Sequence, residues 1–252
     1  MNWALHFLGT GSANASTLGS SAGVLERDGR PMLLIDCAAD TLPRYVDAYG
    51  ALPPVVFITH VHMDHVGGLE HLFSRLCFDV PRPASTRLIV PAALVPLLQG
   101  RVADYPGVAA EGGVNFWDVF RLLPCSRGFW LDGLWFEVFG SRHHRPDTSF
   151  GLALPGCMVW TGDTRPIPEM LTAHAHRGEL IAHDCALQGN PSHSGIDDLE
   201  REYPASVRQR LLACHYGSAA DGDALQSRGM RVARPGQHCE LPDPLPVSAD
   251  AG

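Results

Sequence analysis

Residues 59–68 read Thr-His-Val-His-Met-Asp-His-Val-Gly-Gly and directly follow a short apolar run, Val-Val-Phe-Ile. Side chains two apart in an extended segment point to the same side, so the imidazoles of His60 and His62 can reach one metal ion. Asp64 and His65 stand where the chain turns into a helix and can face a second ion. A surface histidine cluster or a capped helix start is the alternative, but the order of these residues and the strand before them both match what a binuclear site requires. The run predicts a binuclear metal site, and hence a hydrolase.

The chain has 252 residues, of which 45% are hydrophobic and 18% charged, a composition typical of one globular domain. No apolar run approaches the roughly 20 residues that span a bilayer. The first residues, Met1–Leu8, lack the basic start and long apolar core of a signal peptide and are expected to form a strand. Seven cysteines without a Cys-x-x-Cys pair indicate reduced thiols and a cytoplasmic protein.

The chain is acidic, with a net charge of −8 when histidine is neutral. Binding of tRNA or duplex nucleic acid depends on Lys and Arg placed against phosphates, so this charge argues against a long nucleic acid as the partner. A small anion held by a metal centre and a few local arginines stays compatible with it.

Short apolar runs recur along the chain, several of them bounded by Gly or Pro, and are typical of strands. Helical patterns lie between them at 42–49, 65–76 and 196–203. This interleaving predicts one α/β domain, residues 1–240, followed by a flexible tail, residues 241–252. The predicted strands are 3–8, 32–35, 55–59, 87–90, 129–131, 134–139, 150–154, 157–161, 180–183 and 211–214.

The run 59–68 resembles the signature of the metallo-β-lactamase fold superfamily, and later stretches resemble its further motifs in the expected order. The stretch 159–166, Val-Trp-Thr-Gly-Asp-Thr-Arg-Pro, is similar to the ribonuclease Z form of the motif whose aspartate, here Asp163, lies between two metals. His215 follows the strand-like run 211–214, as the last ligand does in that superfamily. The resemblance implies a single domain built as a four-layer αββα sandwich.

A further histidine ligand is expected within residues 141–151, Ser-Arg-His-His-Arg-Pro-Asp-Thr-Ser-Phe-Gly. Strand register favours His144 over His143, and the other histidine is then a polar loop residue. The resemblance implies that one metal is held by His60, His62 and His144 and the other by Asp64, His65 and His215, with Asp163 between them.

No cysteine replaces a ligand in this set. Zinc is therefore the default metal for its nitrogen and oxygen donors, with manganese or iron as alternatives. Asp36, in the stretch Leu-Ile-Asp-Cys, resembles a superfamily aspartate that hydrogen-bonds a metal-binding histidine and so sets its tautomer. A strand-end carboxylate in a turn is the alternative for Asp36.

Two further stretches indicate the branch of the superfamily. Residues 181–186 read Ile-Ala-His-Asp-Cys-Ala, and residues 192–195 read Ser-His-Ser-Gly. In ribonuclease Z and its phosphodiesterase relatives, a strand ending in His and a carboxylate precedes a His-Ser step whose His protonates the leaving oxygen. Asp184 and His193 match these positions, although ribonuclease Z more often has Glu at the first. A solvent-facing histidine near a helix start is the alternative for His193.

The resemblance implies a binuclear phosphodiesterase in which a metal-activated hydroxide attacks phosphorus. Asp64 is expected to take a proton from the attacking water. His193 is expected to protonate the departing alkoxide, for which an imidazole is a suitable acid. Arg145 and Arg165 adjoin the expected ligands and are candidates for holding phosphate oxygens, the alternative being ordinary surface arginines.

Ribonuclease Z carries a basic arm that grips tRNA, inserted between the motifs that correspond to Asp163 and His193. Only the 29 residues 164–192 separate the two here, which leaves no room for that arm. We therefore expect a small phosphodiester, either a cyclic nucleotide or a cyclic sugar phosphate, as the substrate. Ribonuclease Z-like RNA processing, hydrolysis of a carboxylic ester, thioester or lactam, and a non-catalytic binder are the alternatives. A homodimer is expected by resemblance.

Three aromatic residues, Trp117, Phe150 and Tyr216, are candidates for stacking a base, although aromatics in such strands more often belong to the core. The stretch 91–123 is the least readable part of the sequence and is expected to shape the substrate mouth or a dimer face.

Overall fold

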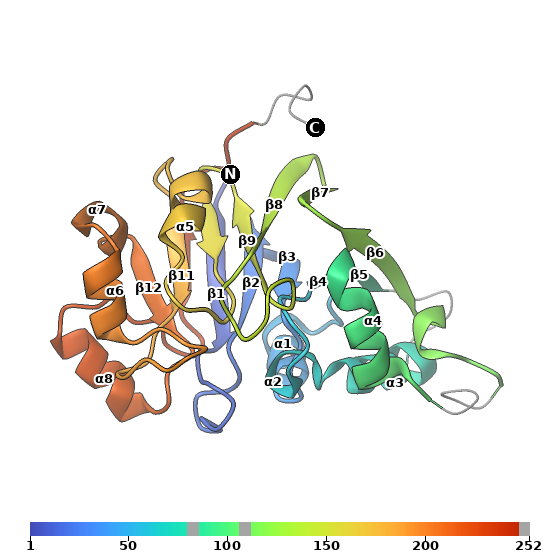
Figure 1. Ribbon diagram of the computed structural model, residues 1–252. Coiled ribbons are helices and arrows are strands. Elements are labelled where there is room, and N and C mark those ends of the chain that lie inside the picture. Colours follow the sequence, from blue (N-terminus) through green and yellow to red (C-terminus); the bar gives the residue numbers. More distant parts are fainter. Residues whose placement is uncertain (80–85, 106–111, 247–252) are drawn as a thin grey trace.

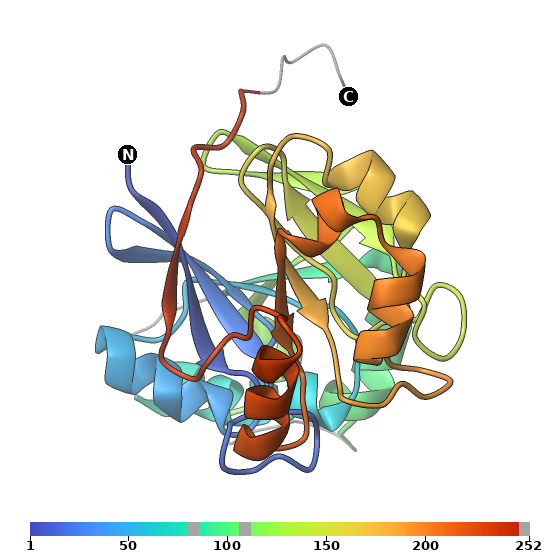
Figure 2. The same ribbon diagram turned by 90° about the vertical axis from the view of Figure 1, so that its left-hand side faces the viewer.

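The computed structural model describes residues 1–79, 86–105 and 112–246. Two β-sheets pack face to face, and helices cover the outer face of each (Figure 1). In the turned view, the blue strands of the first sheet and the yellow and orange strands of the second lie in separate layers (Figure 2). The expected α/β domain with four αββα layers is confirmed.

The first sheet has seven strands in the order β13-β1-β2-β3-β4-β5-β6. Strands β3 to β6 run parallel to one another, and the remaining neighbours are antiparallel. Its strands are Trp3–Gly9 (β1), Ala22–Arg27 (β2), Arg30–Ile35 (β3), Val55–Phe57 (β4), Thr86–Pro91 (β5), Phe120–Cys125 (β6) and His238–Leu241 (β13).

The second sheet has six strands in the order β12-β11-β10-β9-β8-β7. Strands β10, β11 and β12 are parallel, and the others are antiparallel. Its strands are Gly128–Leu131 (β7), Leu134–Gly140 (β8), Phe150–Leu154 (β9), Met158–Trp160 (β10), Leu180–Asp184 (β11) and Leu211–Cys214 (β12).

The α-helices are short. They are Thr41–Tyr49 (α1), Met63–Val66 (α2), Leu69–Phe78 (α3), Val95–Leu98 (α4), Pro168–His174 (α5), Ile196–Glu202 (α6), Ala205–Arg208 (α7) and Ala219–Ser227 (α8). Single turns of other helical types occupy Ala92–Leu94, Gln99–Ala103 and Phe116–Asp118. Within the three described ranges, no helix is both long and apolar enough to cross a membrane.

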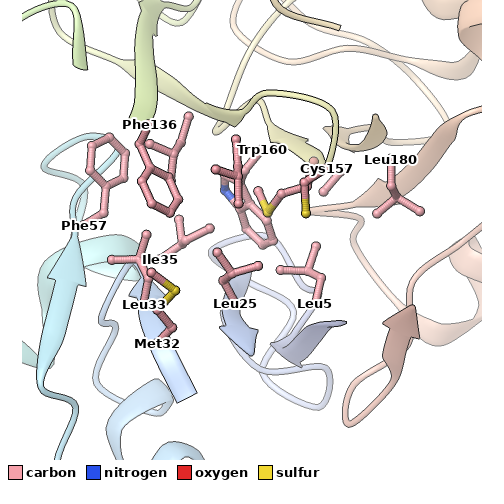
Figure 3. Packing of buried hydrophobic residues seen from close by; sticks show 14 of the residues in the cluster. Leu5, Leu25, Met32, Leu33, Ile35, Phe57, Phe136, Cys157, Trp160 and Leu180 are labelled. Atoms are coloured by element: carbon pink, nitrogen blue, oxygen red, sulfur yellow. The ribbon is translucent and has the colours of Figure 1, made fainter. Parts of the chain in front are cut away.

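Three apolar clusters hold the layers together. The first fills the space between the sheets, where Phe57, Phe136 and Trp160 approach from opposite sides (Figure 3). The second lies between the first sheet and α1, α3 and α4, and includes Tyr45 and Phe73. The third lies between the second sheet and helices α5, α6 and α8. Each sheet is therefore apolar on both faces, as a sheet covered by helices and by a second sheet requires.

The helix expected over 65–76 is divided in two, and the break has a steric cause. The backbone N–H of Gly68 donates to the carbonyl of Cys37 at 2.8 Å. A Cβ at Gly68 would stand 2.2 Å from the carbonyl oxygen of Ala38, so only glycine permits this approach. The contact separates α2, which carries Asp64 and His65, from the rest of the helical segment.

The sequence pattern missed three strands, β2, β6 and β13. Strand β13 is short, begins with an exposed histidine and forms the edge of the first sheet, so it carries little of the alternation that marks a half-buried strand. The boundary expected at residue 240 falls inside β13. Beyond it, the Leu245 N–H donates to the Pro155 carbonyl at 2.9 Å. The last part of the expected tail, 247–252, lies outside the described residues.

Phe136 is a large side chain of the apolar cluster between the sheets, and its removal should destabilise the fold. Phe136 is fully buried and stacks on Phe129 with ring centroids 5.0 Å apart. We expect Phe136→Ala to lower the free energy of unfolding by about 3–5 kcal/mol, because a cavity would remain between the sheets. Phe78→Ala, at a side chain that is 60% exposed, is the control and should change it by less than about 1 kcal/mol. Urea unfolding of both variants measures the difference; equal effects would contradict this packing.

Candidate metal centre

The strands bring the candidate ligands to one edge of the sandwich. His60 follows β4, Asp163 follows β10, Asp184 ends β11 and His215 follows β12. At this edge the two sheets are linked directly, because the Phe150 N–H donates to the Thr59 carbonyl at 2.9 Å. Carboxyl ends of parallel strands are the usual place for a site in layered α/β folds, since side chains from several strands converge there.

The first group of donors combines three imidazoles with one carboxylate. The ligand atoms of His60, His62, His143 and Asp163 all lie within 4.8 Å of one another. His62 Nδ1 stands 3.1 Å from His60 Nε2 and 3.3 Å from His143 Nε2. Two nitrogens bound to the same tetrahedral zinc at 2.0–2.1 Å would be about 3.3 Å apart, so this spacing fits a shared ion.

The second group consists of Asp64, His65 and His215, whose ligand atoms also lie within 4.8 Å of one another. The Asp163 carboxylate stands between the two groups. Its Oδ2 is 3.5 Å from His60 Nε2, 3.4 Å from His65 Nε2 and 3.2 Å from His215 Nε2. The resemblance to the metallo-β-lactamase superfamily implies this position for an aspartate between two metals.

Two atoms of the second group test whether it suits a metal. Nε2 of His65 and Nε2 of His215 are buried and make no hydrogen bond within the described residues. A buried polar atom without a partner costs free energy, and native proteins rarely tolerate it without a reason. A divalent cation between these imidazoles and the carboxylates of Asp64 and Asp163 would satisfy both atoms. The residues present therefore fit two divalent ions.

The pKa values of the first group favour metal binding. Burial lowers the pKa of His60 well below its usual value and that of His143 to about 4. The pKa of His62 is lowered by the same cause. All three rings are therefore neutral at pH 7, which is the form that binds a cation.

Asp163 and the histidines of the second group stabilise each other's charged forms. Burial by itself would raise the pKa of Asp163, but the imidazoles of His215, His65 and His60 outweigh it and hold that pKa well below the usual range. Burial likewise opposes charge on His215 and His65. The carboxylates of Asp163, Asp184 and Asp64 together nevertheless raise the pKa of His215 to about 10. Asp163 and Asp36 raise the pKa of His65 well above its usual value. A divalent cation would replace the protons that these rings hold without it.

Asp36 makes the hydrogen bond expected of it. Its Oδ2 accepts from His65 Nδ1 at 2.7 Å and from the Thr59 hydroxyl at 2.7 Å, and Oδ1 accepts from the Thr59 N–H at 2.8 Å. Asp36 is fully buried and has a positive φ of 63°. The carboxylate holds the proton of His65 on Nδ1, which leaves Nε2 directed toward the donor group.

The structure corrects the choice between the two adjacent histidines. His143 is buried and belongs to the first donor group, whereas no donor group among the described residues includes His144. His144 is exposed, with a φ of 55°, and its Nδ1 contacts the Ser192 hydroxyl at 3.0 Å. The loop leaves the extended conformation at this point, so the strand register that favoured His144 does not continue to it.

Asp184 and His193 form a hydrogen-bonded pair beside the donor groups. Asp184 Oδ2 accepts from His193 Nδ1 at 2.7 Å and from the Thr164 N–H at 2.9 Å, and Oδ1 lies 3.6 Å from His215 Nδ1. Burial would raise the pKa of Asp184, but His193 and His215 lower it overall. With Nδ1 engaged, Nε2 is the ring nitrogen of His193 that is left for a bound molecule.

His183 and Tyr203, for which the sequence motifs predict no role, stabilise this arrangement. His183 Nδ1 donates to the Asp184 carbonyl at 2.7 Å, and the Tyr203 hydroxyl donates to His183 Nε2 at 2.8 Å. The same hydroxyl accepts from the Ile167 N–H at 2.7 Å, so it ties the segment after Asp163 to the end of β11. The contacts of Tyr203 join elements distant in sequence, and no local pattern marks them.

A cleft of about 530 Å³ opens over both donor groups and the Asp184–His193 pair. Its described lining contains no arginine. The lining residues are Ser12, Ala13, Asn14, His62, Asp64, Asp163, Ala186, Leu187, Gln188, Asn190, His193, His215, Gly217 and Asp221.

The two arginines expected to hold phosphate lie outside that lining. Arg165 donates to the Asn190 carbonyl at 2.8 Å and stands 3.6 Å from Asp198 Oδ1, so its guanidinium braces the loop before His193. Arg145 is exposed on the loop that follows His144. Both arginines are close in sequence to the expected ligands, but neither side chain is among the described residues that line the cleft.

None of the three aromatic candidates is among the residues described as lining the cleft. Tyr216 is fully buried and its hydroxyl donates to the Ala233 carbonyl at 2.6 Å. Trp117 donates to Gln99, and Phe150 packs against the apolar clusters. Of the stretch 91–123, residues 106–111 lie outside the described part of the chain.

Comparison with known proteins agrees with this geometry. Residues 3–239 match the family model "Anti-Pycsar protein Apyc1". A protein of that name from Paenibacillus harenae is 30% identical over 247 residues, covering 94% of this chain and 99% of its own. Another, from Bacillus phage BSP38, is 24% identical and covers 92% of this chain and 96% of its own.

Solved structures show the same fold at low identity. The metallo-β-lactamase fold protein YhfI from Bacillus subtilis superposes with a TM-score of 0.73 at 12% identity, covering 95% of this chain and all of its own. A diphosphatase from the PhnP family gives 0.74 at 18%, covering 97% and 99%. The short form of human tRNase Z gives 0.64 at 20%, covering 95% and 100%.

The fold is therefore the metallo-β-lactamase fold, as the sequence motifs implied. The family match spans nearly the whole chain, and the His/Asp groups are those of a metal-dependent hydrolase. The chain belongs to the anti-Pycsar protein Apyc1 family.

Proposed function

We propose that the protein is a binuclear metal-dependent phosphodiesterase that hydrolyses a small phosphodiester, either a cyclic nucleotide or a cyclic sugar phosphate. The observation that carries this proposal is the Asp184–His193 pair, which places an imidazole on the cleft directly beside the two donor groups. Hydrolysis of a phosphodiester needs an acid for the leaving alkoxide, and this imidazole is suited to that task.

Two divalent ions, for which we propose zinc with manganese or iron as alternatives, would supply Lewis acidity to the phosphoryl oxygens and lower the pKa of a water molecule. One ion would be held by His60, His62 and His143, and the other by Asp64, His65 and His215. Asp163 would contact both.

Asp64 and His193 are the residues that we assign to proton transfer. Asp64 lines the cleft, where it would be within reach of the attacking water. Burial opposes its charge, but His215 and His65 lower its pKa overall, so its carboxylate is ionised. Asp184 accepts a hydrogen bond from Nδ1–H of His193, which leaves Nε2 to donate a proton to the departing oxygen. General acid catalysis of this kind contributes about 10²- to 10⁴-fold.

The size and charge of the cleft favour a small substrate. No arginine is among the described lining residues, so the positive charge of the cleft would come from the metals. The segment between Asp163 and His193 is occupied by α5 and β11, and a projecting arm has no chain left to form it. This argues against ribonuclease Z-like processing of RNA. A homodimer and a cytoplasmic location remain predictions from the sequence.

The test of the proposed function is a panel of substrates offered to metal-loaded protein. Bis(p-nitrophenyl) phosphate, 2′,3′- and 3′,5′-cyclic nucleotides, a cyclic sugar phosphate and a tRNA precursor are compared with p-nitrophenyl acetate and nitrocefin. We expect hydrolysis of small phosphodiesters, loss of activity on chelation and recovery on adding metal. Turnover of the ester or the lactam alone would overturn the proposal.

The two adjacent histidines provide a matched pair of variants. We expect His143→Ala to lower kcat/KM by at least about 100-fold and to reduce the metal content, because it removes a donor of the first group. His144→Ala should stay within about threefold of the unchanged protein, since its ring lies outside both donor groups. Metal analysis and kinetics on bis(p-nitrophenyl) phosphate measure both, and the reverse order of effects would restore His144 as the ligand.

The role of His193 predicts a dependence on the leaving group. We expect His193→Ala to lower kcat by roughly 10²- to 10⁴-fold for a cyclic nucleotide, whose alkoxide needs a proton. The loss should be much smaller for bis(p-nitrophenyl) phosphate, because p-nitrophenolate leaves without one. Asp184→Asn should show the same pattern with a smaller loss. A loss that is equal for both substrates would assign His193 to binding instead of acid catalysis.

A further inference from the structure

Asp221 places a carboxylate at the edge of the cleft nearest His215. It lies in the first turn of α8 and lines the cleft together with Gly217. A Cβ at Gly217 would stand 2.7 Å from Asp221 Oδ2, so the carboxylate reaches over the glycine backbone two residues after His215. Glycine at 217 leaves the space that the carboxylate occupies.

This carboxylate has no partner among the described residues. Asp64, Asp163 and Asp184 contact imidazoles, and Asp223, on the same helix, pairs with Arg234 at 2.6 Å. The Asp221 carboxylate makes no such contact in the described ranges. Capping the helix does not require it either, because the Ser218 hydroxyl accepts from the Asp221 N–H at 3.1 Å.

The surroundings of Asp221 disfavour a second anion. The Ser12 N–H donates to the Tyr216 carbonyl at 3.1 Å, which brings the loop of Ser12 and Asn14 beside Gly217. This loop and Asp221 line the same cleft, and no arginine is among the lining residues described to offset the carboxylate. A phosphate placed here would be repelled, whereas an uncharged group with N–H or O–H donors would be bound.

We propose that Asp221 determines substrate specificity by accepting a hydrogen bond from the nucleoside half of a cyclic nucleotide, an inference that rests on the proposed phosphodiesterase function. The donor is an uncharged N–H or O–H group, supplied by the exocyclic amine of the base or by the ribose 2′-hydroxyl. The acyclic phosphodiester bis(p-nitrophenyl) phosphate has neither donor and does not use this contact.

The experiment compares Asp221→Ala with the unchanged metal-loaded protein on matched substrates. These are 3′,5′-cyclic AMP, its inosine analogue without the amine, its 2′-deoxy analogue without the hydroxyl, and bis(p-nitrophenyl) phosphate. A hydrogen bond to a charged group corresponds to roughly 10- to 100-fold in kcat/KM, and we expect a loss of that size for 3′,5′-cyclic AMP. Activity on bis(p-nitrophenyl) phosphate should stay within about twofold.

The analogues identify the donor. If the unchanged protein prefers cyclic AMP over the inosine analogue and Asp221→Ala does not, the amine is the donor. If the unchanged protein prefers cyclic AMP over the 2′-deoxy analogue and Asp221→Ala does not, the hydroxyl is the donor. Either result supports the inference. Unchanged activity of Asp221→Ala on cyclic AMP, or an equal loss on all four substrates, overturns it.

Asp223→Asn is the control variant, since it removes a carboxylate from the same helix outside the cleft lining and should leave all four rates unchanged. Thermal unfolding of both variants confirms that α8 is intact. If the unchanged protein cleaves neither bis(p-nitrophenyl) phosphate nor any cyclic nucleotide, the proposed function has failed. Failure of the Asp221 inference is a different result, because the unchanged protein is then active and only the expected effect of Asp221→Ala is missing.

Discussion

The buried carboxylate of Asp163 is the interaction on which the rest of the site depends. Its Oδ2 lies within 3.5 Å of imidazole nitrogens from His60, His65 and His215. Burial opposes its charge, and only the surrounding imidazoles, or the cations they would bind, keep the carboxylate ionised. The two sheets must therefore pack so that the side chains of these three histidines and this aspartate lie in contact with one another.

Packing between the two sheets and a backbone hydrogen bond at their edge meet this requirement. Phe57, Phe136 and Trp160 fill the space between the sheets below the site. At the edge, the backbone bond from Phe150 to Thr59 joins the end of β4 to the start of β9. Side chains that follow strands of such a core have little freedom to move apart, which is what a preorganised metal centre requires.

The cleft brings together two chemically different kinds of group. Asp184 accepts a hydrogen bond from His193, the imidazole that we propose for proton transfer. Asp221 and Asn14 line the same cleft, and no arginine is among its described lining residues. In the proposed mechanism the charge of the substrate is thus best placed over the donor groups, and its uncharged part beside Asp221.

The sequence predicted the fold class, which the structure confirms. It also singled out residues 59–68, Asp36, Asp163, Asp184, His193 and His215, which the structure brings together at one edge of the sandwich, because the motifs that contain them occur in a recognisable order along the chain. It did not separate His143 from His144, orient Arg145 or Arg165, or mark Asp221 and Tyr203. Those depend on where a loop leaves the extended conformation and on which distant elements pack together. Contacts of that kind leave no local pattern in the sequence, and they are defined only once the distant elements pack together.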